Sequence, residues 1–435
     1  MAVLTIAGSS PDGGAGAQMD LKVFDAIGVT GASVITAITS QNTRETKGFW
    51  WVPPEVVSSQ LSSVFSDMGI TAVKIGMVGN EKIAKTVYEY MKTKKVPIVL
   101  DPVMSAQSDG GSLFEKGALP YLKKLVSISE IVVPNAEECE ALTGIRVKSA
   151  SDAEEAADKL LLMGAKAVLV TGIKTGVISD IFKSDFKFAY TKQMKLGGTK
   201  GGGCALSSAI AALISLGITV PSAVEYAEGF IDAAISHKKK IGRGIDSLDP
   251  LSTLRKDAER YAVLCNMKAA LTMLESHNEF APFIPQSGTN VAYAIMGAKT
   301  THDVAAVVGR VRDAIGIPKS LGVVEFGASS HVASAVLSAM EIEHEKRAAL
   351  NVSSNPKLEG ACKKAGFSVG SIKRKGPRWE DGVIFSKTSK GKVPDVVFDP
   401  GGHGREPVAF IFGTDAISAV TNSLKIIATS YRSTR

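Results

Sequence analysis

In the first half of the chain, short apolar runs alternate with segments in which apolar residues recur every three or four positions. The run at residues 3–7 is followed by a helical pattern over 15–27, which Gly28 ends. The same order of strand and helix continues to about residue 170. Strands that alternate with helices form a parallel sheet covered on both faces. The pattern therefore predicts an α/β fold built on a doubly wound sheet.

The remaining elements of this half follow from the same two periodicities. Residues 177–194 depart from the alternation and are expected to form strands joined by turns. The other expected strands are 34–38, 72–78, 97–100, 130–133 and 167–170, and the expected helices are 53–68, 81–94, 112–127, 136–142, 152–163, 205–216 and 222–238.

A polar stretch with glycines and a proline, residues 237–257, marks the boundary between two domains, and residues 246–257 are the expected linker. It leaves 1–245 as the first domain and 258–435 as the second. The second half does not repeat the first and mixes both periodicities, which predicts a smaller mixed α/β domain. Its expected strands are 322–325, 395–398 and 408–411, and its expected helices are 259–274, 330–343, 356–365 and 416–427.

Composition narrows the class of protein. The 435 residues are 45% hydrophobic and 21% charged, as in globular proteins, and no apolar run is long enough for a signal peptide or a membrane span. Four separated cysteines without a C-x-x-C spacing fit a reducing compartment. The net charge of +7 comes from scattered basic residues, which small phosphorylated substrates explain as well as nucleic acid would. We therefore expect a cytoplasmic protein without membrane or nucleic-acid partners, and a homo-oligomer.

The glycine-rich stretch 197–204, GGTKGGGC, leads directly into a helical pattern. A loop without side chains lets a ligand reach the backbone, and the first N–H groups of a helix have no partner within it. Together they predict a socket for a phosphate or for a negatively charged transition state. Cys204 stands at the helix start near Lys200, where a thiolate is favoured and could act as a base. The alternative is a glycine turn followed by a small buried cysteine.

Candidate site residues follow several of the expected strands. The loop 8–16 follows the first strand, and the others are Gln41, Met77, Asp101 and Asn135, the last together with Glu138. Ligands of open α/β sheets bind at the carboxyl ends of the strands, so these positions predict one pocket. The chain has no G-x-x-x-x-G-K-[ST] and no G-x-G-x-x-G after a strand, which argues against a P-loop kinase and against dinucleotide binding.

These segments resemble the hydroxymethylpyrimidine and hydroxymethylpyrimidine-phosphate kinases of thiamine synthesis, members of the ribokinase-like superfamily. The resemblance extends over about residues 1–250. The segments that carry it are AGSSPDGGAGAQMDLK (7–22), SQNT (40–43), VKIGMV (73–78), LDPVM (100–104), VPNAEE (133–138) and GGTKGGGC (197–204).

The resemblance implies roles at both ends of the pocket. The residues implied for pyrimidine binding are Gly8, Asp20, Gln41 and Met77. Those implied for the base and its anion hole are Cys204 with Gly201, Gly202 and Gly203. At the nucleotide end the resemblance places Asp101 and Asn135 near the transferred phosphate of ATP, and Glu138 where it would organise Mg²⁺.

The sequence departs from the family pattern at several positions. Ser10 stands where the family has an acid, with Asp12 two residues later. Gln107 replaces a lysine, and Thr171 begins a segment that differs from the usual K-G-G-H. The family's THGTGC reads TKGGGC, so Lys200 replaces a histidine. These changes concern side chains, whereas the donors of the anion hole are main-chain N–H groups. Pyridoxal kinase, which shares the superfold, is the alternative substrate assignment.

In the second half, His331 follows two serines that can cap a helix, beside free N–H groups that can hold a phosphate. Arg310, Arg312 and Arg405 offer bidentate grips on phosphate. The alternative for His331 is an exposed surface residue, and His403 within its glycine-rich turn is equally open.

The second half resembles the archaeal-type thiamine phosphate synthase (ThiN) domain over about residues 258–430. The segments are VGRVRD (308–313), VVEFGASSHVASAVLSAM (323–340), AALNV (348–352) and PDVVFDPGGHGREP (394–407). The resemblance implies that Arg310 and His331 are the catalytic pair, with Asn290, Asp399 and Gly402 at the ligand.

The two resemblances together imply a bifunctional enzyme of thiamine synthesis. Its first domain would phosphorylate hydroxymethylpyrimidine and then the monophosphate from Mg-ATP. Its second domain would join the resulting diphosphate to hydroxyethylthiazole phosphate, giving thiamine phosphate and diphosphate. The alternative is a kinase, with pyridoxal as one candidate substrate, followed by a domain that only senses thiamine phosphate.

Overall fold

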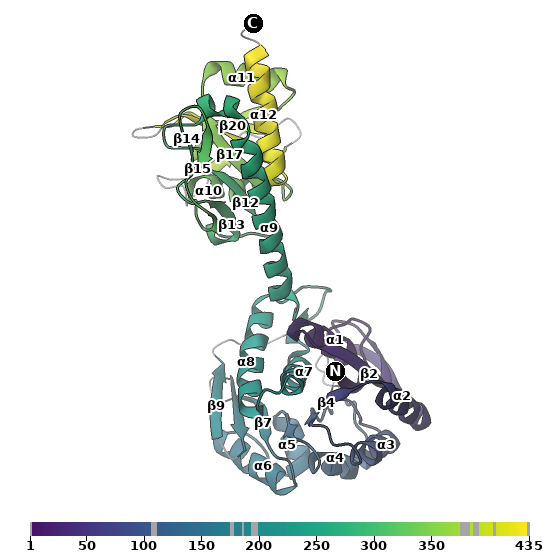
Figure 1. Ribbon diagram of the computed structural model, residues 1–435. Coiled ribbons are helices and arrows are strands. Elements are labelled where there is room, and N and C mark those ends of the chain that lie inside the picture. Colours follow the sequence, from purple (N-terminus) through teal and green to yellow (C-terminus); the bar gives the residue numbers. More distant parts are fainter. Residues whose placement is uncertain are drawn as a thin grey trace. The chain divides into compact units, whose positions relative to one another are not determined.

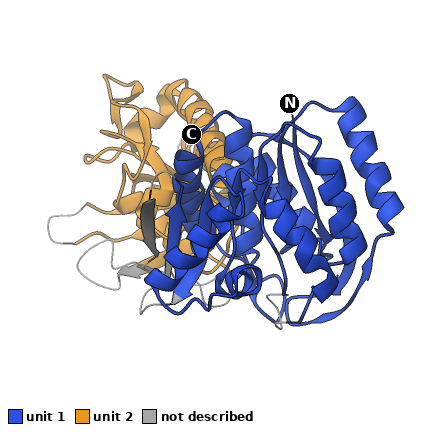
Figure 2. Ribbon diagram, turned by 90° about the horizontal axis from the view of Figure 1, so that it is seen from below, with its two compact units in different colours: residues 1–254 blue, residues 255–435 orange. Residues whose placement is uncertain are grey.

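The computed structural model describes residues 2–105, 111–174, 178–184, 187–192, 199–374, 383–385, 391–402 and 406–432. Two compact units, Met1–Leu254 and Arg255–Arg435, make up the chain (Figure 2). The boundary between them falls within the stretch 246–257 that the sequence marks as a linker. None of the described helices combines the length and the apolar character that a membrane span needs.

The first unit is built on one nine-stranded sheet with the order β3-β2-β1-β4-β5-β6-β7-β8-β9. Neighbouring strands pair in parallel along the central run β2, β1, β4, β5, β6 and β7. At the edges of the sheet, β3, β8 and β9 pair in antiparallel. The strands are β1 (Ala2–Ser9), β2 (Thr30–Gln41), β3 (Thr46–Trp51), β4 (Ile70–Ile75), β5 (Ile98–Leu100), β6 (Ile131–Val132), β7 (Val168–Lys174), β8 (Ile178–Lys183) and β9 (Lys187–Lys192).

Helices cover both faces of this sheet (Figure 1). On one face pack α2 (Pro54–Asp67), α3 (Glu81–Met91), α4 (Leu119–Val126), α5 (Ala136–Thr143) and α6 (Ala150–Leu162). On the other pack α1 (Gly16–Ile27), α7 (Gly202–Ser215) and α8 (Val220–Ser236). The short strands β10 (Thr199–Lys200) and β11 (Asp246–Ser247) pair with each other beside the start of α7. The predicted doubly wound fold is confirmed.

Two elements of this unit differ from the prediction. The helix expected over 112–127 is limited to the 3₁₀ turn η1 (Lys116–Ala118) and α4, because Pro120 lies in the first turn of α4, where proline starts a helix rather than continuing one. The edge strand β3 was not expected. Its sequence TKGFWW does not alternate strictly between apolar and polar residues, which is the signal of a half-buried strand.

The second unit has an eight-stranded, mostly antiparallel sheet with the order β16-β13-β12-β17-β21-β20-β18-β19. The strands are β12 (Val291–Ala294), β13 (Val304–Val307), β16 (Val324–Phe326), β17 (Ala348–Ser353), β18 (Val369–Arg374), β19 (Val383–Phe385), β20 (Val396–Asp399) and β21 (Val408–Gly413), with β14 (Val311–Asp313) and β15 (Pro318–Ser320) as a separate hairpin.

The helices of this unit divide between the two faces of its sheet. One face is covered by α9 (Ser252–Glu275), α11 (Pro356–Lys364) and α12 (Ala416–Arg432). The other face is covered by α10 (His331–Met340). The 3₁₀ turns η2 (Asn278–Phe283) and η3 (Thr301–Asp303) complete the unit, whose predicted mixed α/β class is confirmed.

Two sequence expectations for this unit are incomplete. Helix α9 begins at Ser252, within the expected linker and seven residues before the expected start. The central strands β12, β13 and β17 were missed as strands, because their sequences VAYA, VAAV and AALNVS are rich in alanine, which has a low preference for strands.

Candidate active sites

A cavity of about 300 Å³ lies at the carboxyl ends of the parallel strands in the first unit. It brings together most of the site residues expected from the sequence, and it also contains Lys74 and Lys200. The expected residues that line it are Gly8, Gln41, Met77, Asp101, Asn135, Glu138, Gly202, Gly203 and Cys204.

The glycine loop before α7 is packed against the loop that follows β1. Gly201 caps α7 with a φ of 90°, a backbone conformation that other residues rarely adopt. A Cβ atom at Gly201 would lie 2.2 Å from the carbonyl oxygen of Gly14. Because the two backbones are this close, only glycine fits, and the first N–H groups of α7 remain open to a ligand in the cavity.

A buried charge network lies beneath the cavity. The Lys74 ammonium donates to both carboxylate oxygens of Asp20, at 3.1 and 3.0 Å, and lies 3.8 Å from Asp101 Oδ2. Burial would lower the pKa of Lys74, but the negative charge of Asp20, together with that of Asp101, raises it above its ordinary range. Burial raises the pKa of Asp101 against the opposing effect of Lys74. Lys74 therefore links the buried Asp20 to Asp101, which lines the cavity.

Asp20 does not lie where a pyrimidine ligand was expected. Its side chain is fully buried, and it also accepts hydrogen bonds from Thr5 Oγ1 at 2.6 Å and Ser208 Oγ at 2.7 Å. It is absent from the cavity lining. The direct contact expected for Asp20 is corrected to an indirect one, through Lys74.

The sequence reading missed Lys74 as a site residue, although a signal was present. Strands of a parallel sheet are buried on both faces and read as continuous apolar runs. A lysine inside such a run, as in AVKIGM, is buried only where an acid neutralises it.

Replacing Lys74 with methionine should lower the free energy of unfolding by roughly 3–5 kcal/mol, because the buried Asp20 charge would lose its partner. Urea unfolding of the full chain measures the change. Adding Asp20→Asn to Lys74→Met should recover part of the loss. An unchanged midpoint in the single variant would show that the pair is not stabilising.

Asn135 and Glu138 form a capping box at the start of α5. The Glu138 N–H donates to Asn135 Oδ1 and the Asn135 N–H donates to Glu138 Oε2, both at 2.9 Å. Burial, followed by the charge of Asp101, raises the pKa of Glu138 to about 8. A carboxyl whose pKa is raised by a nearby carboxyl favours a cation beside it. Among the described residues no three His, Cys, Asp or Glu gather as a metal site, but Mg²⁺ commonly uses one or two carboxylates with water and phosphate, so Glu138 fits that ion.

Cys204 departs from the expected chemistry. Burial raises the pKa of its thiol to about 12, against the opposing effect of Lys74. The cation expected beside it, Lys200, is bound to Asp12 instead. The Cys204 thiol lowers the pKa of the neighbouring Asp101 carboxyl, and the Gly16 N–H lowers the pKa of the thiol itself. The expectation of a resting thiolate is therefore wrong, and Cys204 is a protonated thiol beside a carboxylate.

This state of Cys204 should be visible in alkylation with iodoacetamide at pH 8. With a pKa of about 12, only roughly one thiol in ten thousand is ionised at that pH, and the thiolate is the reactive form. Exposed Cys265 should therefore be labelled much earlier than Cys204, as peptide mass spectrometry measures. Labelling of Cys204 ahead of Cys265 would contradict the raised pKa.

In the second unit, several expected residues lie at one end of the large sheet. Asn290 precedes β12, Arg310 follows β13, and Asp399 ends β20. Asn290 and Asn351 share the sheet face covered by α10, since side chains on a strand alternate and their neighbours Ala292 and Ala349 pack there. Asp399, two residues from Val397, faces the same way. This end of the sheet is the candidate site of the second unit.

Asn290 belongs to the framework of that site rather than to its surface. Its side-chain amide donates to the Val307 carbonyl at 3.0 Å and accepts from the Val307 N–H at 2.9 Å. Its N–H donates to Asn351 Oδ1 at 2.7 Å. Both polar atoms of the Asn290 side chain bond to the Val307 backbone, which gives Asn290 a positioning role, and the expected ligand contact stays a prediction.

Arg310 is held in an unusual conformation. Its φ of 68° is in the left-handed region, which an arginine adopts at a cost, and such strain clusters at functional sites. Its Nη1 donates to the Ser287 carbonyl at 2.8 Å. The N–H groups of Gln286 and Ser287 donate to the Glu406 carboxylate at 2.9 and 2.7 Å. The loop 286–290 is thus hydrogen-bonded to Arg310 on one side and to Glu406 on the other.

His331 begins α10 on the expected helix start. The Val332 N–H donates to Ser329 Oγ at 3.3 Å, and the ring of His331 packs edge-on against Phe410 with centroids 5.2 Å apart. Phe410 pairs with Val397 in β20, two residues before Asp399. His331 therefore lies over the strands that lead to the site. Gly402 is exposed beyond Asp399, and His403 and Arg405 lie outside the described residues, as does Gln107 in the first unit.

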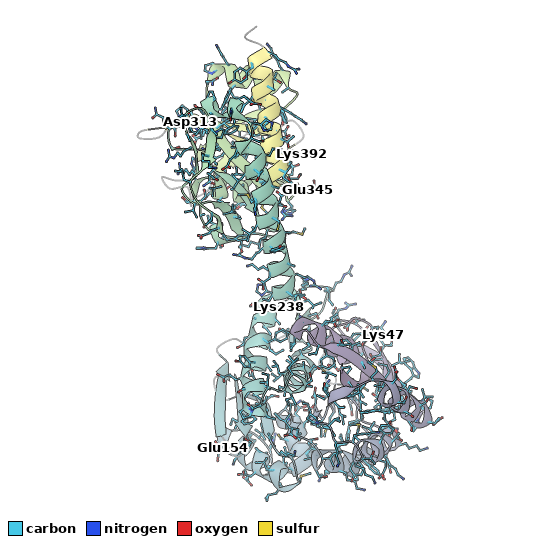
Figure 3. The ribbon with its side chains drawn as sticks, viewed as in Figure 1. Lys47, Glu154, Lys238, Asp313, Glu345 and Lys392 are labelled. Atoms are coloured by element: carbon cyan, nitrogen blue, oxygen red, sulfur yellow. The ribbon has the colours of Figure 1, made fainter. Side chains whose placement is uncertain are left out.

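Surface lysines in both units lie beside acids. Lys47 lies 3.7 Å from Glu45 and Lys238 lies 3.1 Å from Asp246. Lys392 lies 3.7 Å from Glu343. Figure 3 labels these three lysines. At these positions the excess positive charge is interspersed with negative charge.

Comparison with known proteins agrees with this division of the chain. Residues 10–249 match the family of phosphomethylpyrimidine kinases, and residues 266–425 match the family of ThiN thiamine-phosphate synthases. The hydroxymethylpyrimidine/phosphomethylpyrimidine kinase of Aquifex aeolicus is 38% identical over 254 residues, which is 57% of this chain and 100% of that protein. The bifunctional thiamine biosynthesis protein ThiDN of Methanocaldococcus jannaschii is 29% identical over 433 residues, 97% of both chains.

Solved structures also resemble the first unit. The pyridoxal kinase of Staphylococcus aureus in complex with pyridoxal matches with a TM-score of 0.54 and 29% identity, over 58% of this chain and 94% of that one. An ADP complex of Bacillus subtilis pyridoxal kinase matches with a TM-score of 0.54 and 27% identity, over 58% and 98%.

Proposed function

The chain belongs to the phosphomethylpyrimidine kinase family and carries a thiamine-phosphate synthase domain behind the kinase, and from this we propose how its two sites divide the work. The chain is a bifunctional enzyme of thiamine biosynthesis that uses ATP as a co-substrate. The observation that carries the proposal for the kinase is the cavity that holds Cys204, Asp101 and the open N–H groups of α7 together.

For the kinase, we propose that the pyrimidine lies at the end of the cavity lined by Gly8, Gln41 and Met77. The other end, at Asn135 and Glu138, takes the nucleotide. Glu138 would hold Mg²⁺, which supplies positive charge to the phosphates. The main-chain N–H groups of Gly202 and Gly203 would stabilise negative charge on the transferred phosphoryl group.

The state of Cys204 defines how a proton can leave the alcohol. As the alcohol oxygen bonds to the γ-phosphorus of ATP, the bond from that phosphorus to the β–γ bridging oxygen breaks and ADP leaves, while the alcohol proton passes to the Cys204 sulfur. The thiol proton passes at the same time to the neighbouring Asp101 carboxylate. Neither a resting thiolate nor a net charge on sulfur is needed. Lys74 balances the Asp101 charge before the transfer and the Asp20 charge throughout.

For the second unit, we propose that coupling takes place at the sheet end that carries Arg310 and Asp399, with His331 over it. The carbon–oxygen bond of the pyrimidine diphosphate breaks, and the thiazole nitrogen bonds to the same carbon. Arg310 would neutralise the departing diphosphate, and His331 would donate a hydrogen bond to it. Because charge grows on the leaving oxygen, these contacts strengthen in the transition state.

The direct experiment incubates the full chain with hydroxymethylpyrimidine, hydroxyethylthiazole phosphate and Mg-ATP and measures thiamine phosphate. The proposal expects its formation, with loss of activity on removal of Mg²⁺ by EDTA. Accumulation of the pyrimidine diphosphate without thiamine phosphate would leave a kinase with a sensing domain, which tight binding of thiamine phosphate in calorimetry would then identify.

Pyridoxal remains a second candidate substrate, because solved pyridoxal kinases share the fold of the first unit. Comparing kcat/KM for pyridoxal and for hydroxymethylpyrimidine decides between them. The proposal expects the pyrimidine to be preferred, and a preference for pyridoxal would overturn it.

A further inference from the structure

Lys200 is a buried cation at the cavity that the proposed kinase mechanism does not use. It directly precedes Gly201, the cap of α7, and 2% of its side chain is exposed. Its Nζ donates to Asp12 Oδ2 at 2.5 Å and to the Asn42 carbonyl at 3.3 Å. Lys200 thus lines the cavity at the place where three loops meet.

The two hydrogen bonds of Lys200 use two of the three N–H donors of its ammonium group. A lysine ammonium has three N–H groups, and Asp12 and Asn42 accept from two of them. Within the described ranges the third has no acceptor. A buried donor without a partner costs free energy, whereas one that faces a cavity can be satisfied by a ligand. The geometry therefore favours a ligand that accepts hydrogen bonds at this position.

The charges around the cavity indicate which ligand needs this donor. Lys74 and Lys200 are the cations in the described lining, and Lys74 already lies between Asp20 and Asp101. Glu138 adds a further acid. A neutral alcohol can enter such a site without help. The acceptor of the second phosphorylation already carries a phosphate, and a dianion among these carboxyls requires a cation.

Contacts of Lys200 place it at the acceptor end rather than at the nucleotide end. Asn42 directly follows Gln41, the proposed pyrimidine ligand. Asp12 accepts at 2.8 Å from Ser10 Oγ, which also lies 3.3 Å from Gln41 Oε1. In the part of the chain that the structure describes, the hydrogen bonds of Lys200 go to Asp12 and Asn42 and none goes to Asn135 or Glu138, where the nucleotide is proposed.

We propose that Lys200 binds the phosphate of the monophosphorylated pyrimidine and so determines the efficiency of the second phosphorylation relative to the first. The proposal rests on the kinase function proposed above. Lys200 keeps its bond to Asp12 and donates its remaining N–H to the substrate phosphate. Asp12 holds the ammonium in place, and burial raises the strength of the charge-assisted bond.

The test supplies hydroxymethylpyrimidine and its monophosphate separately to the purified full chain and compares kcat/KM for each. In Lys200→Gln, the ratio of monophosphate to alcohol efficiency should fall roughly 10- to 100-fold, the worth of one charge-assisted hydrogen bond. Lys200→Arg, which keeps the charge, should recover part of this ratio. The KM for ATP, measured with the alcohol as acceptor, should move less than the KM for the monophosphate.

Two matched variants separate ligand binding from loop architecture. Asp12→Asn removes the partner of Lys200 but keeps the cation, and Lys22→Gln removes another lysine that fastens the same loop, through the Gly13 carbonyl at 2.7 Å. Lys22→Gln should leave the substrate ratio within about threefold of the original, a spread small against one charge-assisted bond, whereas Asp12→Asn, which loosens the ammonium, should lower the ratio by less than Lys200→Gln does. Equal losses on both acceptors in Lys200→Gln and Asp12→Asn would overturn the proposal in favour of a latch between loops. A rise confined to the KM for ATP would assign Lys200 to the nucleotide. A wild-type chain inactive on the alcohol would instead contradict the proposed function itself.

Discussion

Replacing His331 with alanine should reduce thiamine phosphate formation by roughly 10²–10³-fold, the range for loss of one donor to a developing negative charge. The kinase reactions should continue, so the pyrimidine diphosphate should accumulate. His331 begins α10, and the helix dipole favours an anion at that end. Its ring is fixed against Phe410 over the strand pair that leads to Asp399. A donor held rigidly in this way stabilises the leaving diphosphate without reorganisation.

The measurement is turnover with supplied pyrimidine diphosphate and hydroxyethylthiazole phosphate. Because the interaction belongs mainly to the transition state, kcat should fall more than the affinity for thiamine phosphate. His344→Ala is the matched control, since His344 is an exposed histidine of the same unit. Normal turnover in His331→Ala would remove His331 from the mechanism. Equal losses in the two histidine variants would indicate an effect on folding.

Replacing Cys204 with alanine should slow phosphorylation of the alcohol by roughly 10²–10⁴-fold, the contribution of a positioned proton-transfer group, and should slow the second phosphorylation less, because its acceptor is an already ionised phosphate. The coupling of supplied pyrimidine diphosphate should continue, because Cys204 belongs to the other unit. The thiol joins the cavity to Asp101, so alanine breaks the only proposed path for the alcohol proton. Since the anion hole consists of main-chain N–H groups, binding of ATP should change less than turnover.

Two control variants make the Cys204 result interpretable. Cys204→Ser keeps a group that can pass a proton and should retain more activity than alanine. Cys265→Ala, at an exposed cysteine of the second unit, should leave both phosphorylations as they are. An unchanged kinase rate in Cys204→Ala would make Cys204 a packing residue, and Asp101 would then have to accept the alcohol proton directly.

The fold of the first unit could be predicted from the sequence because its hydrophobic periodicities are strong and its glycines occupy positions that other residues cannot. Gly201 lies so close to the Gly14 carbonyl that a residue with a Cβ atom does not fit there. The run of glycines around it predicts a helix start that is open to a ligand. What the sequence could not supply is the pairing of charges. Lys200 is near Cys204 along the chain but bonds to Asp12, while Lys74, distant along the chain, is the cation beside Cys204. Proximity in sequence is therefore a poor guide to the pKa of a buried thiol.

The second unit was harder to derive because its framework uses small and polar residues. Alanine-rich strands give little periodic signal, so the sheet centre was not foreseen. Asn290 reads as a ligand by its polarity, yet its amide replaces a missing strand contact with Val307. His331 was placed correctly because capping serines mark a helix start, which is a local signal. Features that depend on residues nearby in the sequence, such as a helix start, were therefore predicted correctly. Features that depend on contacts between strands were not.

The central claim is that one chain carries out phosphorylation and coupling at two separate sites. Mixing Cys204→Ala with His331→Ala tests it most directly, with hydroxymethylpyrimidine, hydroxyethylthiazole phosphate and Mg-ATP as the substrates. Each variant alone should form little thiamine phosphate, the first for want of the diphosphate and the second for want of coupling. The mixture should form it at a substantial rate, because diphosphate released by His331→Ala reaches the intact second site of Cys204→Ala. A mixture no more active than either variant alone would contradict the claim.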